Sequence, residues 1–147
     1  MKFQGMIAGI GLIVILSMAT CTSWGSAIET EPVNDEELKK LQQERIEVLR
    51  EIQKHSQVLE QKGLASSSDV FGAMIAVERA MQDAATTDRE RLDSLKRIIK
   101  IYEQEFAKSE AGYRVGANSF QELMSNKANV LGARVEHEKL KLKIAGE

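Results

Sequence analysis

The amino-acid sequence predicts an all-α protein made of two consecutive antiparallel helical hairpins. Three observations predict this class. No proline follows Pro32, apolar residues recur at intervals of three and four instead of alternating, and one helix-turn-helix motif occurs twice. The hairpins could fold together as a four-helix bundle or remain an extended antiparallel coiled coil, and the sequence leaves both arrangements open.

The repeated motif has the form Gly-x-x-Ser-x-x-acid. Its copies are Gly63, Ser66 and Asp69, and then Gly116, Ser119 and Glu122. A glycine adopts the left-handed backbone conformation that ends many helices. A serine three positions later caps the next helix, and an acid three positions further on completes a capping box. The motif therefore predicts two tight turns, at residues 62–66 and 115–119, that each join antiparallel helices.

The helix starts are marked in order along the chain. Residues 28–33 contain the only proline and predict a flexible leader, after which strong helix formers dominate. Four pairs of a cap residue and an acid mark four starts: Asn34 with Glu37, Ser66 with Asp69, Thr87 with Glu90, and Ser119 with Glu122. They place the first hairpin at residues 34–86 and the second at residues 87–147. Whether the chain turns at Thr87 or continues there as one helix stays open.

Each predicted helix has an apolar stripe that indicates its packing face. In chain order, the stripes are Leu38, Leu41, Val48, Leu49, Ile52 and Leu59; Val70, Met74, Val77, Met81 and Ala84; Leu92, Leu95, Ile98, Ile99, Ile101, Tyr102 and Phe106; and Phe120, Met124, Ala128, Leu131, Val135 and Leu142. Small residues are expected to let neighbouring helices approach closely: Gly72, Ala76, Ala80, Gly132 and Ala133.

A second match between the hairpins lies upstream of the turns. The segment Glu44-Arg45-Ile46-Glu47 resembles Glu90-Arg91-Leu92-Asp93, 46 positions later, whereas the turn glycines are 53 positions apart. The difference is one heptad, and an inserted heptad lengthens a helix while keeping its stripe on nearly the same face. The sequence therefore predicts a duplicated hairpin in which the first helix of the second copy is one heptad longer.

The N-terminal segment has the pattern of a secretory signal peptide. A basic start at Lys2, an apolar run over residues 6–19 and small residues up to Ala27 predict a signal peptide at 1–27, cleaved after Ala27. Two alternatives stay open. The run could remain as a membrane anchor, although a span needs roughly 20 apolar residues, or Cys21 could be lipidated, since residues 16–21 resemble a bacterial lipobox. The sequence thus predicts export, with a periplasmic or secreted location, and membrane attachment only in those two cases.

Composition and spacing argue against several functions. The net charge of -2 does not favour nucleic acid or an anionic membrane surface as a partner. Cleavage after Ala27 would leave no cysteine for a disulfide. Glu51 lies four positions before His55, but one such pair is common by chance on a charged helix, and the neighbours Glu136 and Glu138 do not share a helix face with His137. No nucleophile has an identifiable base and no phosphate-binding glycine loop occurs, so we expect no enzyme activity, no cofactor and no metal.

The second turn resembles a known family. The segment Tyr113-Arg114-Val115-Gly116-Ala117-Asn118-Ser119, continuing Phe120-Gln121-Glu122-Leu123-Met124, resembles the helical hairpin turn of TolC-type outer-membrane efflux proteins. The first copy, residues 63–73, is similar more loosely, and the resemblance covers residues 44–144. In that family the turn joins two long antiparallel tunnel helices and meets the tip of a periplasmic adaptor. The family's barrel strands have no counterpart here, so small exported proteins built only from such hairpins are the better match.

These observations predict a non-enzymatic exported structural or interaction module of the bacterial envelope. It would act by helix-face association with itself or with another helical envelope protein. The alternative is an accessory of TolC-type efflux systems that docks a periplasmic adaptor through its turns. Eight residues are the candidate site, as helix ends and caps with partner contact as a possible second role: Gly63, Ser66, Asp69, Tyr113, Arg114, Gly116, Ser119 and Glu122.

Overall fold

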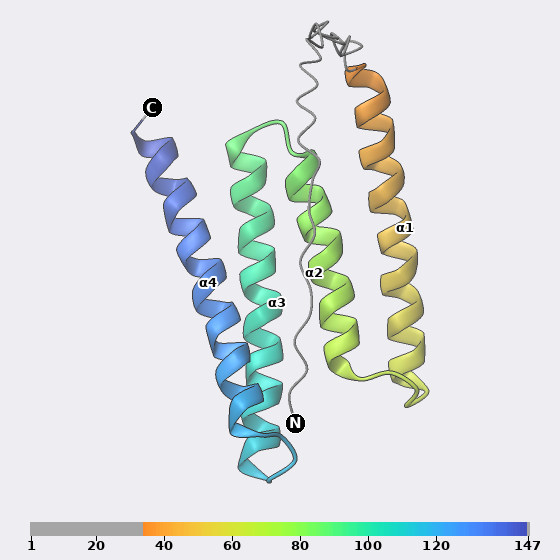
Figure 1. Cartoon of the computed structure of the whole chain (residues 1–147), viewed down its shortest axis with the longest axis vertical. Coiled ribbons are helices and arrows are strands. Elements are labelled where there is room, and N and C mark those ends of the chain that lie inside the picture. Colours follow the sequence, from red (N-terminus) through yellow and green to blue (C-terminus); the bar gives the residue numbers. More distant parts are fainter. Residues whose placement is uncertain (1–33, 147) are drawn as a thin grey trace, which may run out of the picture. The chain divides into compact units, whose positions relative to one another are not determined.

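The computed structural model describes residues 34–146, which form four α-helices. They are α1 (Asp35–Gln61), α2 (Ser67–Ala84), α3 (Asp88–Arg114) and α4 (Phe120–Ala145) (Figure 1). The described residues contain no strand, so the predicted all-α class is confirmed. The chain does turn at Thr87, since α2 and α3 are separate helices. The predicted signal peptide, the leader and Cys21 lie outside the described residues.

Two helices begin with complete capping boxes. The Ser66 hydroxyl accepts from the Asp69 backbone N–H at 3.2 Å, and the Asp69 carboxylate accepts from the Ser66 N–H at 2.9 Å. Thr87 and Glu90 repeat this pair of bonds at 3.2 and 3.1 Å. Each box satisfies two N–H groups that the first helical turn leaves without partners, which is why α2 and α3 begin where the sequence predicts.

The other two starts use half of the expected box. The Asn34 side chain accepts from the backbone N–H of Glu36, at 3.1 Å, and not from that of Glu37, the predicted partner. Ser119 accepts from the N–H of Glu122 at 3.1 Å, but the Glu122 carboxylate accepts from the Asn118 side chain at 2.7 Å instead of returning a bond to Ser119. The cap residues are confirmed, and the reciprocal bonds are not formed.

Both hairpin turns close with the same backbone bonds. The glycines of the two turns have φ of 70° and 75°, in the left-handed region. This conformation lets the Leu64 N–H donate to the Leu59 carbonyl at 2.8 Å, and the Ala117 N–H donate to the Gly112 carbonyl at 2.8 Å. This is the Schellman pattern, in which the residue after the glycine bonds back across the last helical turn. The predicted turns are confirmed.

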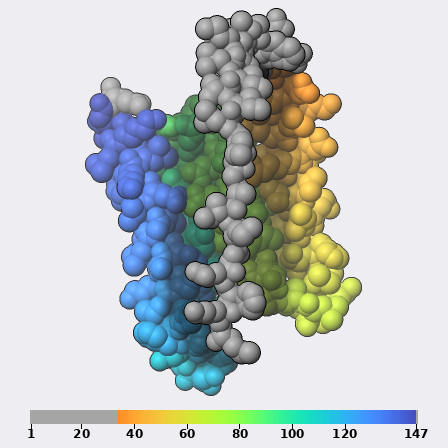
Figure 2. Space-filling model, viewed as in Figure 1, coloured from red at the N-terminus to blue at the C-terminus, as the bar shows by residue number. Residues whose placement is uncertain are grey.

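The helices form an open antiparallel array. α1 packs on α2, α2 on α3, and α3 on α4, and the backbones of the described helices approach in no other pairing. α1 and α4 are therefore the two edges of the array (Figures 1 and 2). Two long side chains reach past a neighbouring helix: Lys108 of α3 to Glu60 of α1, at 3.4 Å, and Arg79 of α2 to Glu136 of α4, at 2.7 Å.

The core lies along the two inner helices. Leu95 and Ile98 of α3 are 1% and 0% exposed and are the largest fully buried side chains among the described residues. The predicted stripes of α2 and α3 are confirmed, since they supply the buried residues Val70, Val77, Leu95, Ile98 and Ile101. The edge helices contribute less, with Ile46 from α1 and Leu123, Val130 and Ala133 from α4.

The predicted packing faces of the edge helices are wrong. Most of those apolar residues are exposed instead of buried: Leu38, Leu41, Val48 and Ile52 in α1, and Phe120, Met124, Ala128, Leu131, Val135 and Leu142 in α4. An edge helix has one neighbour, so only one of its faces is covered. Among the small residues, Ala80 and Ala133 are buried as expected, whereas Gly72 and Gly132 face open space.

The expected one-heptad difference between the hairpins is also wrong for their first helices. α1 and α3 both have 27 residues. Their caps, Asn34 and Thr87, are as far apart in sequence as the two turn glycines. The match between Glu44-Arg45-Ile46-Glu47 and Glu90-Arg91-Leu92-Asp93 therefore pairs residues at different heights of the two helices, because a charged amphipathic helix repeats similar residues every heptad.

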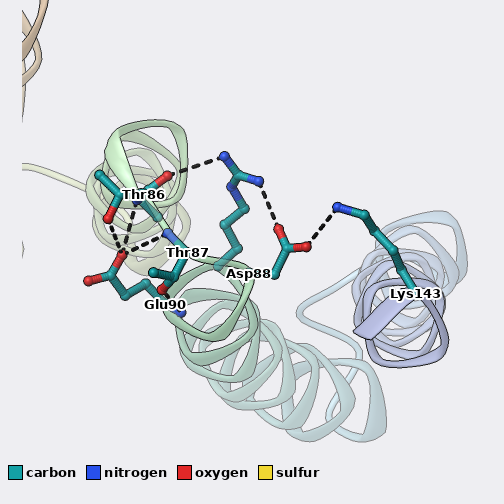
Figure 3. A network of polar contacts seen from close by, with 7 residues as sticks. Thr86, Thr87, Asp88, Glu90 and Lys143 are labelled. Carbon is teal, nitrogen blue, oxygen red and sulfur yellow. Dashed lines mark hydrogen bonds and ion pairs between the residues drawn. The ribbon is translucent and has the colours of Figure 1, made fainter. Parts of the chain in front are cut away.

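A polar network ties the start of α3 to the end of α4. The Asp88 carboxylate accepts from Arg91 at 2.8 Å and from Lys143 at 2.7 Å (Figure 3). Beside it, the Glu90 carboxylate accepts from the N–H groups of Thr86 and Thr87. The hydrogen bond from Lys143 is the largest cause that lowers the pKa of Asp88 below its ordinary value, and the bond from Thr87 is the largest that lowers the pKa of Glu90.

Acid is expected to destabilise the fold partly through this network. Because the pKa of Asp88 is lower in the folded chain than in the unfolded chain, its contribution to stability is present above the unfolded pKa and is lost as pH falls below about 4. The Tm, measured by circular dichroism, should therefore fall between pH 7 and pH 3. Asp88→Asn should lower the Tm at pH 7 and reduce the size of that fall, and an unchanged pH profile in this variant would contradict the assignment.

Candidate interaction surfaces

The free face of α1 carries a line of exposed apolar side chains. Leu38, Leu41, Val48 and Ile52 are 45%, 56%, 56% and 49% exposed, and we call these four residues the α1 seam. With Arg45 between Leu41 and Val48, the positions follow the alternating spacing of three and four that is typical of a coiled-coil seam. A different set of residues, including Ile46, faces α2. α1 is therefore apolar on two faces, and among the described helices only α2 packs against it, on one of them.

α4 has the same two-sided character. Leu123, Val130 and Ala133 are buried on its α3 side. Its other side carries Met124, Leu131, Val135 and Leu142, which are 37%, 52%, 54% and 73% exposed. We call these four residues the α4 seam, in which Ala128 and Glu138 complete the three-and-four spacing. Contiguous exposed apolar surface of this kind is typical of interaction sites.

The two predicted turns lie close to each other. Ser66 of the first turn and Asn118 of the second line one pocket of about 410 Å³, together with Ser67 and Ser68 at the start of α2 and Glu122 at the start of α4. The structure thus brings together two of the predicted site residues, Ser66 and Glu122. Gly63 and Gly116 are exposed and serve the turns, and the Asp69 carboxylate is held by Ser66, whose hydrogen bond lowers the pKa of Asp69.

The second turn presents an exposed apolar tip. The rings of Tyr113 and Phe120 lie 6.1 Å apart at 56°, and Phe120 and Val115 are 60% and 78% exposed. Arg114 pairs with Glu110 at 3.1 Å along α3, in the last turn of the helix, where a cation is favourable. The predicted tip residues are thus accessible, and Phe120 adds to them.

Gly112, which is not among the predicted site residues, lies against the second turn. A Cβ at Gly112 would lie 2.5 Å from the Asn118 Oδ1 atom, so the Asn118 side chain packs directly against this glycine. The signal was present in the sequence, because Gly112 precedes the turn glycine Gly116 by one helical turn.

The pocket between the turns holds a polar cluster. Ser67 donates to the Glu60 carboxylate at 2.6 Å, and Lys108 donates to the Ser67 hydroxyl at 2.9 Å. The bond from Ser67 is the largest cause that lowers the pKa of Glu60, and Lys108 also lies 5.1 Å from the centre of the Phe71 ring. The cluster therefore ties α1, α2 and α3 together.

The histidines are placed apart from each other. His55 is exposed on α1, and His137 is largely buried on α4, where its Nδ1 lies 3.1 Å from Glu138. Within residues 34–146, no three side chains of His, Cys, Asp or Glu are gathered as metal ligands would be. None of the described helices contains a stretch long and apolar enough to cross a membrane.

Fold and surface together define a class: an all-α protein of two consecutive helical hairpins with apolar seams left open on both edge helices. Comparison with protein-family models, with curated proteins and with solved structures found no match. The resemblance of the second turn to TolC-type proteins therefore stays a prediction from the sequence.

Proposed function

We propose that this protein is a non-enzymatic structural module of the bacterial envelope, exported from the cytoplasm, that associates with other helices through α1 and α4. The α1 and α4 seams carry this proposal. Each seam offers four large apolar side chains in coiled-coil spacing, and no helix within residues 34–146 covers them. Fully burying one such side chain contributes about 1.5–3 kcal/mol relative to full exposure. The seam side chains are 37–73% exposed, so a helix laid along a seam would gain roughly half of that figure from each of them.

A second candidate function uses the turns instead of the edges. The Tyr113–Phe120 ring contact and the exposed Val115 favour a tip that meets another protein. In this case the protein would dock a periplasmic adaptor of a TolC-type efflux system through its turns, as the sequence resemblance implies.

One set of variants separates the two functions. Replacing Leu41, Val48 and Ile52 together with Gln should abolish association, measured by chemical cross-linking in cells and by sedimentation of the purified protein. The helical content and the Tm at low protein concentration should change little, because these side chains are about half exposed already. The tip variant Arg114→Ala with Val115→Ser, also at exposed positions, is the matched control and should associate normally.

The reverse result would favour the turns. Loss of association in the tip variant with full association in the seam variant would establish the docking function. If the unaltered protein associates with nothing in either measurement, the proposed function is contradicted.

A further inference from the structure

Acidic residues run along one border of the α1 seam. Glu37, Glu44 and Glu51 follow one another at intervals of seven, so they share one line along the helix. All three are exposed. They lie next to Leu38, to Arg45 and to Ile52, on the side of the seam that points away from α2. We call these residues the acidic border.

Basic residues take the corresponding place on α4. Lys127, Arg134 and Lys141 are also spaced by seven and are all exposed. Each of them stands directly before a position in the three-and-four spacing of the α4 seam, namely Ala128, Val135 and Leu142. The residues of the acidic border stand in the same relation to the α1 seam. Arg134 pairs with Glu103 of α3 at 2.6 Å and is 57% exposed, so it still has donors that face solvent. We call these residues the basic border.

Each seam also contains one charge within its apolar line. Arg45 interrupts the α1 seam and Glu138 interrupts the α4 seam. Both are accessible: the side chains are 56% and 59% exposed. Arg45 contacts Asp83 of α2 at 2.9 Å, and Glu138 contacts His137 and Lys141 of its own helix. The two interrupting charges are opposite in sign, like the two borders.

We propose that the occupant of these seams is a second copy of this chain, with α1 of one copy packed antiparallel on α4 of the next. This inference rests on the proposed function and names its partner. One register aligns the two apolar lines from Leu41 of α1 to Leu59, and leaves Leu38 beyond the last pair. It places Leu41 against Leu142, Arg45 against Glu138, Val48 against Val135, Ile52 against Leu131, His55 against Ala128, and Leu59 against Met124. Four of these pairs join two large apolar residues, one joins the two interrupting charges, and one sets His55 against the small Ala128.

Charge selects this pairing over the symmetric ones. In two antiparallel coiled helices the same border of each seam faces the same border of its partner. An α1–α1 pair would therefore set the acidic border against itself, and an α4–α4 pair would do the same with the basic border. The α1–α4 pair sets the acidic border against the basic one, and opposite charges beside a seam decide partner and orientation in coiled coils.

The direction of the helices agrees with this pairing. Consecutive helices alternate in direction, so α1 and α4 of one chain run oppositely. A second copy in the same orientation therefore continues the alternation. The contact joins two different surfaces, so every added copy leaves one α1 edge and one α4 edge free. Such head-to-tail contacts produce a ring when the rotation between copies closes, and a filament when it does not.

Disulfide trapping tests the pairing directly. The described residues contain no cysteine, so Val48→Cys with Val135→Cys introduces one thiol on each edge of the full chain. Mild oxidation in cells should give a ladder of dimers, trimers and larger species, because each copy would be linked on both sides. Each single variant should give no ladder. The unaltered protein should give none either, and it shows whether Cys21 forms links by itself. The matched control is Gln43→Cys with Asn129→Cys, which are exposed positions outside both seams.

Other outcomes would overturn the pairing. Dimers from Val48→Cys alone would mean that α1 meets α1, and dimers from Val135→Cys alone would mean that α4 meets α4. Links only to a different protein would reject self-association while leaving the proposed function intact. The double-cysteine protein could also give no ladder while the Gln variant of the α1 seam still loses association. That result would likewise reject self-association and leave the proposed function intact.

A charge exchange checks the register. Arg45→Glu and Glu138→Arg should each reduce the ladder of the double-cysteine protein by roughly three- to fivefold, and the two together should restore it. Arg45→Glu also removes the ion pair with Asp83 of the same chain. The helical content of each variant is therefore measured, to separate a loss of folding from a loss of association. Restoration has to arise between copies, because α1 and α4 are not in contact within one chain. Failure of the exchange to restore the ladder would reject this register.

Discussion

Replacing Ile98 with Ala is expected to lower the free energy of unfolding by about 2–5 kcal/mol. Ile98 is 0% exposed and lies in α3, which packs on both α2 and α4. Removing three carbon atoms there loses their burial and leaves a cavity that neighbours on both sides would have to fill. Urea unfolding followed by circular dichroism measures the change.

The matched control for Ile98 is the same substitution at an edge. Ile144 is 39% exposed near the end of α4, and Ile144→Ala should cost much less, on the order of 1 kcal/mol. Equal losses at the two positions would mean that α3 is not the centre of the core. They would also mean that the edge helices are covered in the conditions of the measurement.

Replacing Gly116 with Ala is expected to lower the free energy of unfolding by about 1–2 kcal/mol, which is the cost of placing a Cβ in the left-handed region. Gly116 has φ of 75°, and no heavy atom lies within 4 Å of the position that a Cβ would occupy. The expected loss therefore comes from the backbone conformation and not from a collision. Thermal and urea unfolding both report it.

Gly72 supplies a control that differs from Gly116 only in conformation. It lies within α2, and a Cβ there would also meet nothing within 4 Å. Gly72→Ala should raise the free energy of unfolding by up to about 1 kcal/mol, since alanine is the better helix former. The same substitution is thus expected to have opposite signs at the two glycines. A gain in stability at Gly116 would show that the turn does not need its left-handed residue.

The sequence predicted the features that are decided locally. Ser66 and Thr87 cap their helices because the partner of each lies three residues away, and the left-handed glycines follow from the backbone alone. These rules need no knowledge of distant parts of the chain. The helix starts and both turns were therefore within reach of sequence analysis, whereas the reciprocal bonds at Asn34 and Ser119 depended on competing neighbours such as Asn118.

The packing faces depended on the number of neighbours that each helix has. Ile52 and Ile98 both belong to apolar stripes, yet one is half exposed and the other is fully buried. Only the order of helices in the array separates them, and periodicity within a helix does not report that order. A sequence signal did exist in α4, because Leu123 and Val130 form a second stripe beside Met124 and Leu131. Two stripes on one helix indicate two neighbours, of which the described helices supply one, α3.

The backbones of the described helices pack only between consecutive helices, and this arrangement affects how the chain folds. Its contacts join segments that are near one another in sequence, and such a low contact order is typical of domains that fold within microseconds to milliseconds. It also allows the structure to open in steps from its edges. α1, with one buried residue, would exchange its amide hydrogens before α3, so local opening would release an edge helix while the inner pair stays folded.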